Sequence, residues 1–477
     1  MAINLSRNTK VYFTTSVSAS NGVLIASAIA AANTFEIQVL DGYSFSQGTQ
    51  QQNIQISEAG ATPARGQRAF NTQLDPVEWS FSTYIRPYVA TGTLYAAEQY
   101  LWNALLGDQV LSTTTANISS LTRATTTAAA ATLVTTAVLQ KKFSAADTAT
   151  NLVVEDIINV NGFVGTGVPF NEPARITAIT GTTYTVEYAS APGTGATGIG
   201  TTSATTVATA GHWSQGTTAT GNYSYVSTMG SNKNSLQRFA LIFVVDQAVY
   251  CIENCAVDQV TIDFGLDAIS TLAWTGKGTK LSKISAPTIV NLQSSLTAAA
   301  AVTTANYITN KLSTVTLQSA IGGTEGLAAS TSYSVPLTGG SISIANNINY
   351  LVPTNLAIVN TPIGYYTGQR AISGNLTAYL RTGTSGDTGS LLSDILTAST
   401  STTEPKYKLQ VELGGSTGVN RVEFEMSGVV LQVPSVNVAD VVATTINFAA
   451  QGFDPVQGNQ GFDITKNNDL LVRYFTA

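Results

Sequence analysis

The chain has 477 residues, of which 44% are hydrophobic and 10% are charged, and its formal net charge is −6. This length exceeds a single ordinary core, so we expect more than one domain. Aliphatic and aromatic residues are spread in strand-like runs, which excludes a disordered chain, and the negative balance disfavours a protein that grips nucleic acid through its phosphates.

The clearest strand pattern lies between residues 65 and 87. From Trp79 to Ile85 apolar and polar residues alternate, which predicts a half-buried antiparallel strand that ends before Pro87. The residues before it, up to the pair Asp75-Pro76, indicate a polar turn.

Weaker patterns surround this strand. Residues 35–46 alternate around a hairpin-type turn at Asp41-Gly42, and residues 53–60 alternate again. Residues 94–106 change to the apolar spacing of a helix, and strand patterns resume over residues 239–278. We therefore expect a sheet or barrel with a single helix packed against it.

Residues 111–222 differ in composition from their surroundings. Thr, Ala and Gly dominate them, and alternating runs lie in their middle. We expect a small β domain, immunoglobulin-like or simpler, inserted in a loop of the first unit, because surface loops tolerate insertion best. The alternative is a disordered low-complexity arm. The first unit would then comprise residues 1–110 and 223–281.

Residues 282–477 repeat the order of the first unit. Segment 339–344 corresponds to 41–46, segment 368–372 to 66–70, and segment 376–381 to 81–86. Segment 391–396 corresponds to the helix, and segment 407–413 to the strand from Phe239. Near the end of the chain, Phe448 corresponds to Trp274 in this alignment of the two halves. Matches in the same order indicate a duplication, so we expect a second unit over residues 282–477.

Four segments carry a resemblance to a known family. They are SEAGATPARGQRAFN at 57–71, EWSFSTYIRP at 78–87, NNINYL at 346–351 and AISGNLTAYL at 371–380. They resemble the tail tube proteins, or major tail proteins, of tailed bacteriophages, most closely the two-copy fused subunits of long non-contractile tails. The resemblance covers nearly the whole chain except the insert.

The resemblance implies an assembly. Each unit would be a β-barrel or sandwich with one helix, whose inner sheet joins those of its neighbours into a ring, and a two-copy subunit would form rings of three chains. Stacked rings would form the hollow tube that conducts DNA to the host. The implied partners are other copies of the chain, other tail proteins (tape measure, terminator, baseplate or tip) and genomic DNA that passes without specific binding. The insert would lie outside the tube, as decoration, as stiffening or as a contact to host surface or sugars.

Nine residues are candidates for contacts between subunits or for structural roles: Arg65, Arg68, Trp79, Tyr84, Arg86, Trp274, Arg370, Tyr379 and Arg381. Sparse charge at repeated positions favours salt bridges between subunits for the arginines, and solvated surface positions are the alternative. The two tryptophans are expected in the core.

We find no pattern for catalysis, a cofactor or a metal, and we expect the chain not to be an enzyme. Asp258, Asp263 and Asp267 lie on neighbouring strand patterns, but no base, nucleophile or metal partner recurs near them. The alternative class is a β-rich surface adhesin or S-layer protein, of which a Thr-rich insert is typical. The start of the chain lacks the pattern of a signal peptide, so we expect synthesis in the host cytoplasm and a final location in the virion tail.

Overall fold

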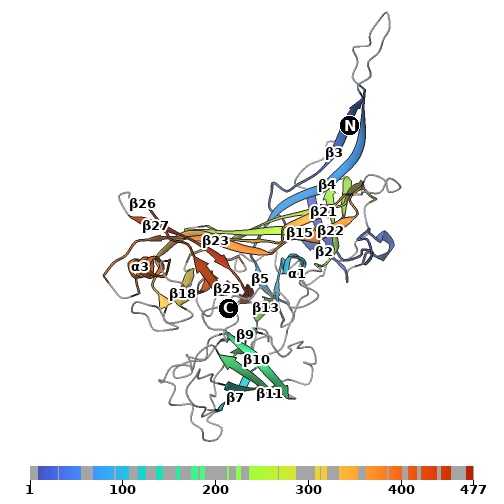
Figure 1. The fold of residues 1–477 in the computed structure, drawn as a ribbon. Coiled ribbons are helices and arrows are strands. Elements are labelled where there is room, and N and C mark those ends of the chain that lie inside the picture. Colours follow the sequence, from blue (N-terminus) through green and yellow to red (C-terminus); the bar gives the residue numbers. More distant parts are fainter. Residues whose placement is uncertain are drawn as a thin grey trace, which may run out of the picture.

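The computed structural model describes residues 9–30, 32–54, 68–90, 93–106, 117–124, 136–142, 157–161, 173–180, 183–188, 212–213, 222–226, 236–266, 268–285, 307–311, 313–319, 332–352, 361–383, 386–399, 407–415, 420–437, 442–452 and 469–475. Antiparallel strands dominate these residues, which contain two α-helices, α1 (Gln99–Leu106) and α3 (Thr388–Ser399) (Figure 1). The prediction of a mainly β chain is confirmed.

One long antiparallel sheet, the central sheet, runs through the molecule (Figure 1). Its neighbours in order are β3 (Ser44–Ile54), β4 (Arg68–Tyr84), β16 (Thr271–Gly278), β15 (Ala248–Gly265), β20 (Leu337–Ala345), β23 (Ala371–Tyr379), β27 (Ala443–Ala450) and β26 (Ser435–Asn437). The pairing of β15 with β20 joins the half of the sheet before residue 282 to the half after it.

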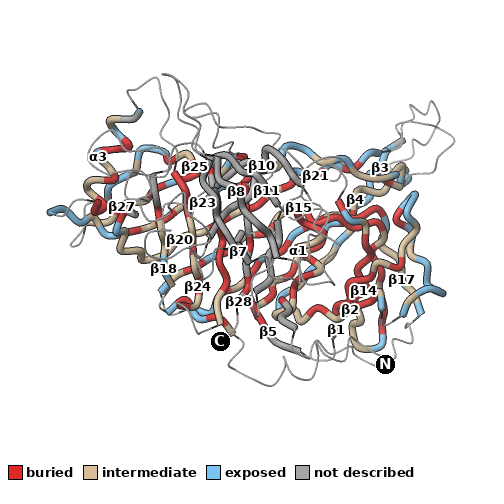
Figure 2. The backbone as a smooth tube through the Cα atoms, turned by 90° about the horizontal axis from the view of Figure 1, so that it is seen from below, coloured by how far each residue is buried: buried red, intermediate tan, exposed pale blue. Residues whose placement is uncertain are grey.

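Two outer sheets cover the central sheet. The first contains β2 (Thr34–Ile37), β1 (Thr9–Thr14), β14 (Phe239–Val245), the beginning of β15 and β17 (Lys280–Lys283). The second contains β19 (Ser332–Tyr333), β18 (Thr314–Ser319), β24 (Tyr407–Leu413), β25 (Arg421–Leu431), β28 (Leu471–Phe475) and β13 (Asn222–Val226). The buried hydrophobic residues between the sheets form one core that runs through both halves (Figure 2).

The same pairing scheme occurs twice along the chain. The first series is β1, β2, β3, β4, α1, β14, β15 and β16, and the second is β18, β19, β20, β23, α3, β24, β25 and β27. In each series the first strand pairs with the second and with the strand after the helix, and the fourth strand pairs with the last. Chain order and strand pairing therefore repeat together.

A pair of residues in each series consists of an aromatic ring and a glycine. Trp79 on β4 lies opposite Gly276 on β16, and Gly374 on β23 lies opposite Phe448 on β27. A Cβ atom on Gly276 would clash with the indole of Trp79, and a Cβ atom on Gly374 would clash with the ring of Phe448. The ring and the glycine have thus exchanged strands between the two series.

This register corrects one correspondence expected from the sequence. Trp274 lies opposite Phe81, and the residue in the same position of the second series is Ile446, which lies opposite Leu376. Phe448 occupies the position of Gly276, two residues away from the expected one. The expected alignment set Phe448 against Trp274, whereas the ring of Phe448 packs over Gly374 as the ring of Trp79 packs over Gly276.

The hairpin of β3 and β4 rises away from the rest of the chain in Figure 1. Strand β4 begins at Arg68, so the expected polar turn before Trp79 is instead part of a 17-residue strand. The register of the hairpin shifts between Gln47 and Thr49, opposite Asp75 and Pro76. A bulge tolerates a proline, which has no N–H to donate to the ladder, and this explains a strand where the sequence indicated a turn.

The turn at Asp41-Gly42 does not close a hairpin. Strand β2 pairs with β1 and strand β3 pairs with β4, so the turn carries the chain from an outer sheet to the central sheet. Gly42 has a φ of 94°, a conformation that glycine adopts without strain.

Helix α1 is shorter than expected and is packed in the core. Residues before it form β6 (Thr93–Ala96), which pairs with β5 (Pro87–Ala90). The indole of Trp102 is buried, donates a hydrogen bond of 2.7 Å to the Tyr474 hydroxyl and meets Trp274 edge to face at 5.1 Å. The helix therefore connects β28, the last strand described, to the central sheet.

Glu98 precedes this helix and is buried. It accepts a hydrogen bond from Tyr474, while its Oε2 atom has no hydrogen-bond partner. Burial raises the pKa of Glu98 from 4.5 to about 7, against the opposing effects of the Tyr474 hydrogen bond and the charge of Arg86. Between about pH 4.5 and pH 7, Glu98 therefore holds a proton in the folded chain that it has released in the unfolded chain.

Replacing Glu98 with glutamine is expected to flatten the pH dependence of stability. The favourable contribution of Glu98 to the free energy of unfolding is fully present below about pH 4.5. It is lost as the pH rises through about 7, which lowers the free energy of unfolding by roughly 3 kcal/mol. Urea unfolding of Glu98→Gln and of the exposed control Glu78→Gln between pH 4 and pH 8 would measure it. Equal slopes for Glu98→Gln and the unsubstituted chain would refute this origin.

The strands between residues 117 and 213 form a separate closed barrel. Its members are β7 (Asn117–Ala124), β8 (Thr136–Lys142), β9 (Ile157–Asn161), β10 (Pro173–Thr180), β11 (Thr183–Tyr188) and β12 (His212–Trp213). The barrel lies below the rest of the chain in Figure 1. A further hairpin, β21 (Ile348–Leu351) with β22 (Gly364–Thr367), follows β20, and Ala26–Ala28 form a 3-10 turn.

Candidate functional site: the polar face of the central sheet

The two faces of the central sheet differ in chemistry. Alternate residues are buried in the core, for example Phe81, Trp274 and Ile262. Between them lie half-buried or exposed residues on the other face, here called the polar face: Ser44, Ser46, Ser80, Ser82, Gln259, Thr261, Thr275, Ser341, Ser343, Ser373, Asn375, Thr377, Thr445 and Asn447. Uncharged hydroxyl and amide side chains therefore predominate on the polar face, which also carries the charged residues Glu78, Asp263 and Lys277.

Hydrogen bonds connect these side chains across strands. The hydroxyls of Ser44 and Ser80 lie 2.8 Å apart, between β3 and β4. Gln259 donates to the Ser343 hydroxyl at 2.7 Å, which links β15 to β20 at the junction of the two halves. Asn375 donates to the Ser341 hydroxyl at 2.8 Å, between β23 and β20. The polar face thus continues without interruption from one half into the other.

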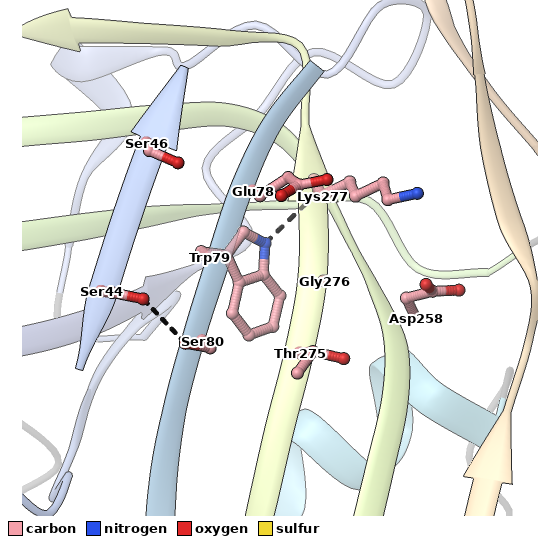
Figure 3. Close-up of a pocket in the computed structure, with 9 residues that line it drawn as sticks. All are labelled: Ser44, Ser46, Glu78, Trp79, Ser80, Asp258, Thr275, Gly276 and Lys277. Atoms are coloured by element: carbon pink, nitrogen blue, oxygen red, sulfur yellow. Dashed lines mark hydrogen bonds between the residues drawn. The ribbon is translucent and has the colours of Figure 1, made fainter. Parts of the chain in front are cut away.

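A hollow of about 300 Å³ lies on this face, lined by residues of β3, β4, β16 and β15 (Figure 3). Its lining residues are Ser44, Ser46, Glu78, Trp79, Ser80, Asp258, Thr275, Gly276 and Lys277. The carboxylate of Asp258 accepts a hydrogen bond from the amide of Ile348 at 2.7 Å, so it fixes the start of β21. The hollow combines serine and threonine hydroxyls with three charged side chains.

The charges of the hollow belong to one half only. Glu78 on β4 lies opposite Lys277 on β16, a cross-strand pair of opposite charge. The equivalent pair in the second series is Ser373 opposite Ala449. The second half of the polar face is therefore the more neutral one.

The described residues contain neither a metal-binding cluster nor a membrane-spanning helix. No group of three or more His, Cys, Asp or Glu side chains in this part of the chain could hold a metal ion. No helix within the same ranges is long and apolar enough to cross a membrane.

Trp79 and Trp274 lie in the core under the polar face. Both side chains are buried. Trp79 donates a hydrogen bond of 3.3 Å to the carbonyl of Lys277, and Trp274 donates one of 2.9 Å to the Thr83 hydroxyl. Each indole therefore connects β4 to β16 and has its N–H satisfied, as buried tryptophans require.

Arg86 and Tyr84 lie at the exit of β4 and contact residues of their own chain. The guanidinium of Arg86 donates to Gln38 and stacks over the ring of Tyr307 at 5.4 Å. The ring of Tyr84 meets that of Tyr307 edge to face at 5.1 Å. Arg86 is buried within the single chain, which differs from the solvated surface position considered as the alternative.

Arg370 is also bound within the chain. Its Nε and Nη2 atoms donate to Asp469 at 3.0 and 2.6 Å, and both side chains are largely buried. Tyr379 and Arg381 are exposed at the end of β23, where they are accessible for a contact between subunits. Arg65 and the side chain of Arg68 lie outside the described residues.

The neutral residues of the polar face were not among the candidates from the sequence. Their signal was present, because Ser, Thr, Asn and Gln are the commonest residues in the polar phase of the alternating strands. The candidates from the sequence were arginine and aromatic residues, which are rarer in the chain. The informative feature was the absence of charge from this phase in β20, β23 and β27.

Comparison with known proteins adds independent information. No family model matches the chain. The chain is 23% identical over 467 residues to the tail tube protein pb6 of Escherichia phage T5, a match that covers 97% of this chain and 75% of that protein. The resemblance to phage tail tube proteins is confirmed. The matched span also includes the insert, and a tail tube relative supports a structural component of a virion tail rather than an enzyme.

Proposed function

We propose that the chain is the structural subunit of a phage tail tube, which assembles as stacked rings of three chains. The observation that carries this proposal is the central sheet, which has one core face and one uninterrupted polar face across both halves. A sheet of this kind is suited to form part of the wall of a tube, with its outer sheets and helices on the core side.

The repeated pairing scheme supports two tandem tube units in one chain. We assign residues 1–110 and 223–281 to the first unit, residues 111–222 to the insert and residues 282–477 to the second unit. Both units belong to one sheet and share one core, so they are held in a fixed relation. Three such chains would fill six similar positions in a ring, which is the arrangement that closed symmetry favours.

The polar face is assigned to the lumen of the tube. DNA binds proteins mainly where lysine and arginine neutralise its phosphates and release counterions. The polar face offers mostly hydroxyls and amides, and the chain has 22 basic against 28 acidic residues. Such a surface would let DNA slide past without holding it, as passage to the host requires.

The remaining partners follow from the same role. A tube ends at other tail proteins, so we expect contacts with a tape measure protein inside, a terminator at one end and a baseplate or tip at the other. The inserted barrel would lie outside the tube, because the lumen must stay open. Repetition along the tube would give it many weak contacts to host surface or sugars.

Electron microscopy of the purified protein tests the proposal. Hollow tubes or three-chain rings are the expected result. Monomers that bind to host cells would overturn it and favour the alternative class, a β-rich surface adhesin or S-layer protein.

A further inference from the structure

The pairing of β15 with β20 is a joint between two units that is present within one chain. Thr261 lies opposite Ser343, Ile262 opposite Ile342 and Asp263 opposite Ser341. Ile262 and Ile342 are fully buried on the core face. This joint shows how one unit continues the sheet of the next.

Strand β26 in the second unit corresponds to the joint segment of β15. On β15, Thr261 and Ile262 lie opposite Ala273 and Leu272 of β16. On β26, Ser435 and Val436 lie opposite Thr445 and Thr444 of β27. Those partners are themselves equivalent, because Ala273 faces Ser82 and Thr445 faces Thr377 on the repeated fourth strand. Ser435 and Val436 therefore correspond to Thr261 and Ile262.

Strand β3 in the first unit corresponds in the same way to β20. Phe45 lies opposite Trp79, and Ile342 lies opposite Gly374, the residue equivalent to Trp79. Ser46 and Ser44, on either side of Phe45, therefore correspond to Ser343 and Ser341. This register moves the correspondence by one residue from the one expected from the sequence.

Both strands have an open edge in the single chain. At the joint positions β3 pairs with β4, β26 pairs with β27, and neither has a second partner strand among the described residues. Val436 is 43% exposed, whereas its counterpart Ile262, covered by the neighbouring unit, is 0% exposed. An exposed apolar residue on an open edge marks a site where another strand adds.

We propose that β26 of one chain pairs antiparallel with β3 of the next chain, with Ser435 opposite Ser46, Val436 opposite Phe45 and Asn437 opposite Ser44. This inference rests on the proposed function and specifies the partner and register of its ring contact. Each unit then contributes four strands in the same order, and the polar face continues from chain to chain. Val436 then lies opposite the apolar residue Phe45, as Ile262 lies opposite Ile342.

The two kinds of joint are not equally strong. Strand β15 runs through its joint as one strand of 18 residues. In the second unit β25 ends at Leu431 and β26 has only three residues, with Pro434 in the gap between them. Proline has no N–H for a ladder. The joint between chains is therefore shorter than the joint within a chain, and the ring opens there first.

A disulfide across the joint tests the register. Ser46 and Ser435 are exposed on the polar face, so Ser46→Cys with Ser435→Cys leaves the core unchanged. Residues directly opposite in an antiparallel pair have Cα atoms about 4.5–5.5 Å apart, within reach of a disulfide. Oxidation of assembled protein should link chains into a three-chain species on a non-reducing gel, and reduction should restore single chains.

The matched control shifts the register by one residue. Ser46→Cys with Val436→Cys places the thiols on opposite faces and should not link. The native thiols do not interfere, because Cys251 and Cys255 are buried and burial raises the pKa of Cys251 to about 12. Tubes that give no link, or the shifted link, would overturn the joint and leave the tube function standing. Absence of tubes would overturn the function on which the joint rests.

Discussion

Alanine in place of Gly276 is expected to destabilise the folded chain by about 3 kcal/mol or more, at the upper end of what overpacking costs. The added Cβ atom would meet the indole of Trp79 and also the carbonyl of Ala256, which belongs to the backbone of β15. A ring can turn aside, but a backbone carbonyl in a paired strand cannot move without disturbing its ladder. The substitution therefore strains the place where β4, β16 and β15 meet.

Thermal or urea unfolding of Gly276→Ala measures this effect. The matched control is Gly265→Ala at the end of β15, where a Cβ atom would have no atom within 4 Å. We expect the control to melt close to the unsubstituted chain. If Gly276→Ala melted with its control, the close packing of Trp79 over the glycine would be incorrect.

Methionine in place of Lys408 is expected to cost about 3–5 kcal/mol. The ammonium of Lys408 lies 2.8 Å from the carboxylate of Glu425, and the two side chains are 8% and 0% exposed. Removal of the lysine takes a counter-ion at 2.8 Å away from a carboxylate that is shielded from water. The loss reflects the cost of that buried charge more than the strength of the pair itself.

A double variant separates the cost of the unpaired buried charge from the strength of the ion pair itself. Lys408→Met with Glu425→Leu removes both charges and should recover most of the lost stability. Lys10→Met is the surface control, because Lys10 is 52% exposed and lies 3.6 Å from Glu36, and it should change stability by less than about 1 kcal/mol. Urea midpoints of the three variants measure this series. A double variant as unstable as Lys408→Met would contradict the explanation.

Local patterns predicted the parts of the fold that depend on neighbouring residues. Alternation from Trp79 to Ile85 identified the buried and polar faces of β4, and apolar spacing identified a helix that ends at Leu106. Pairing between distant strands decided the rest. The turn at Asp41-Gly42 connects two sheets, and the bulge opposite Pro76 lets a strand continue where local signals indicated a turn.

The candidate site was predictable in composition but not in position. The Ser and Thr residues that alternate with core residues are visible in the sequence, whereas their union into one face depends on the pairing of β15 with β20. Arg86 and Arg370 show the opposite case. Their partners Gln38 and Asp469 lie far away along the chain, so composition alone favoured surface positions for residues that the fold buries.

A helical reconstruction of assembled tubes by electron cryo-microscopy tests the central claim most directly. The proposed function predicts three chains in each ring, with the polar face of the central sheet, including Ser80 and Ser343, turned toward the lumen. Six chains in each ring, or a polar face turned to the outside of the tube, would contradict it.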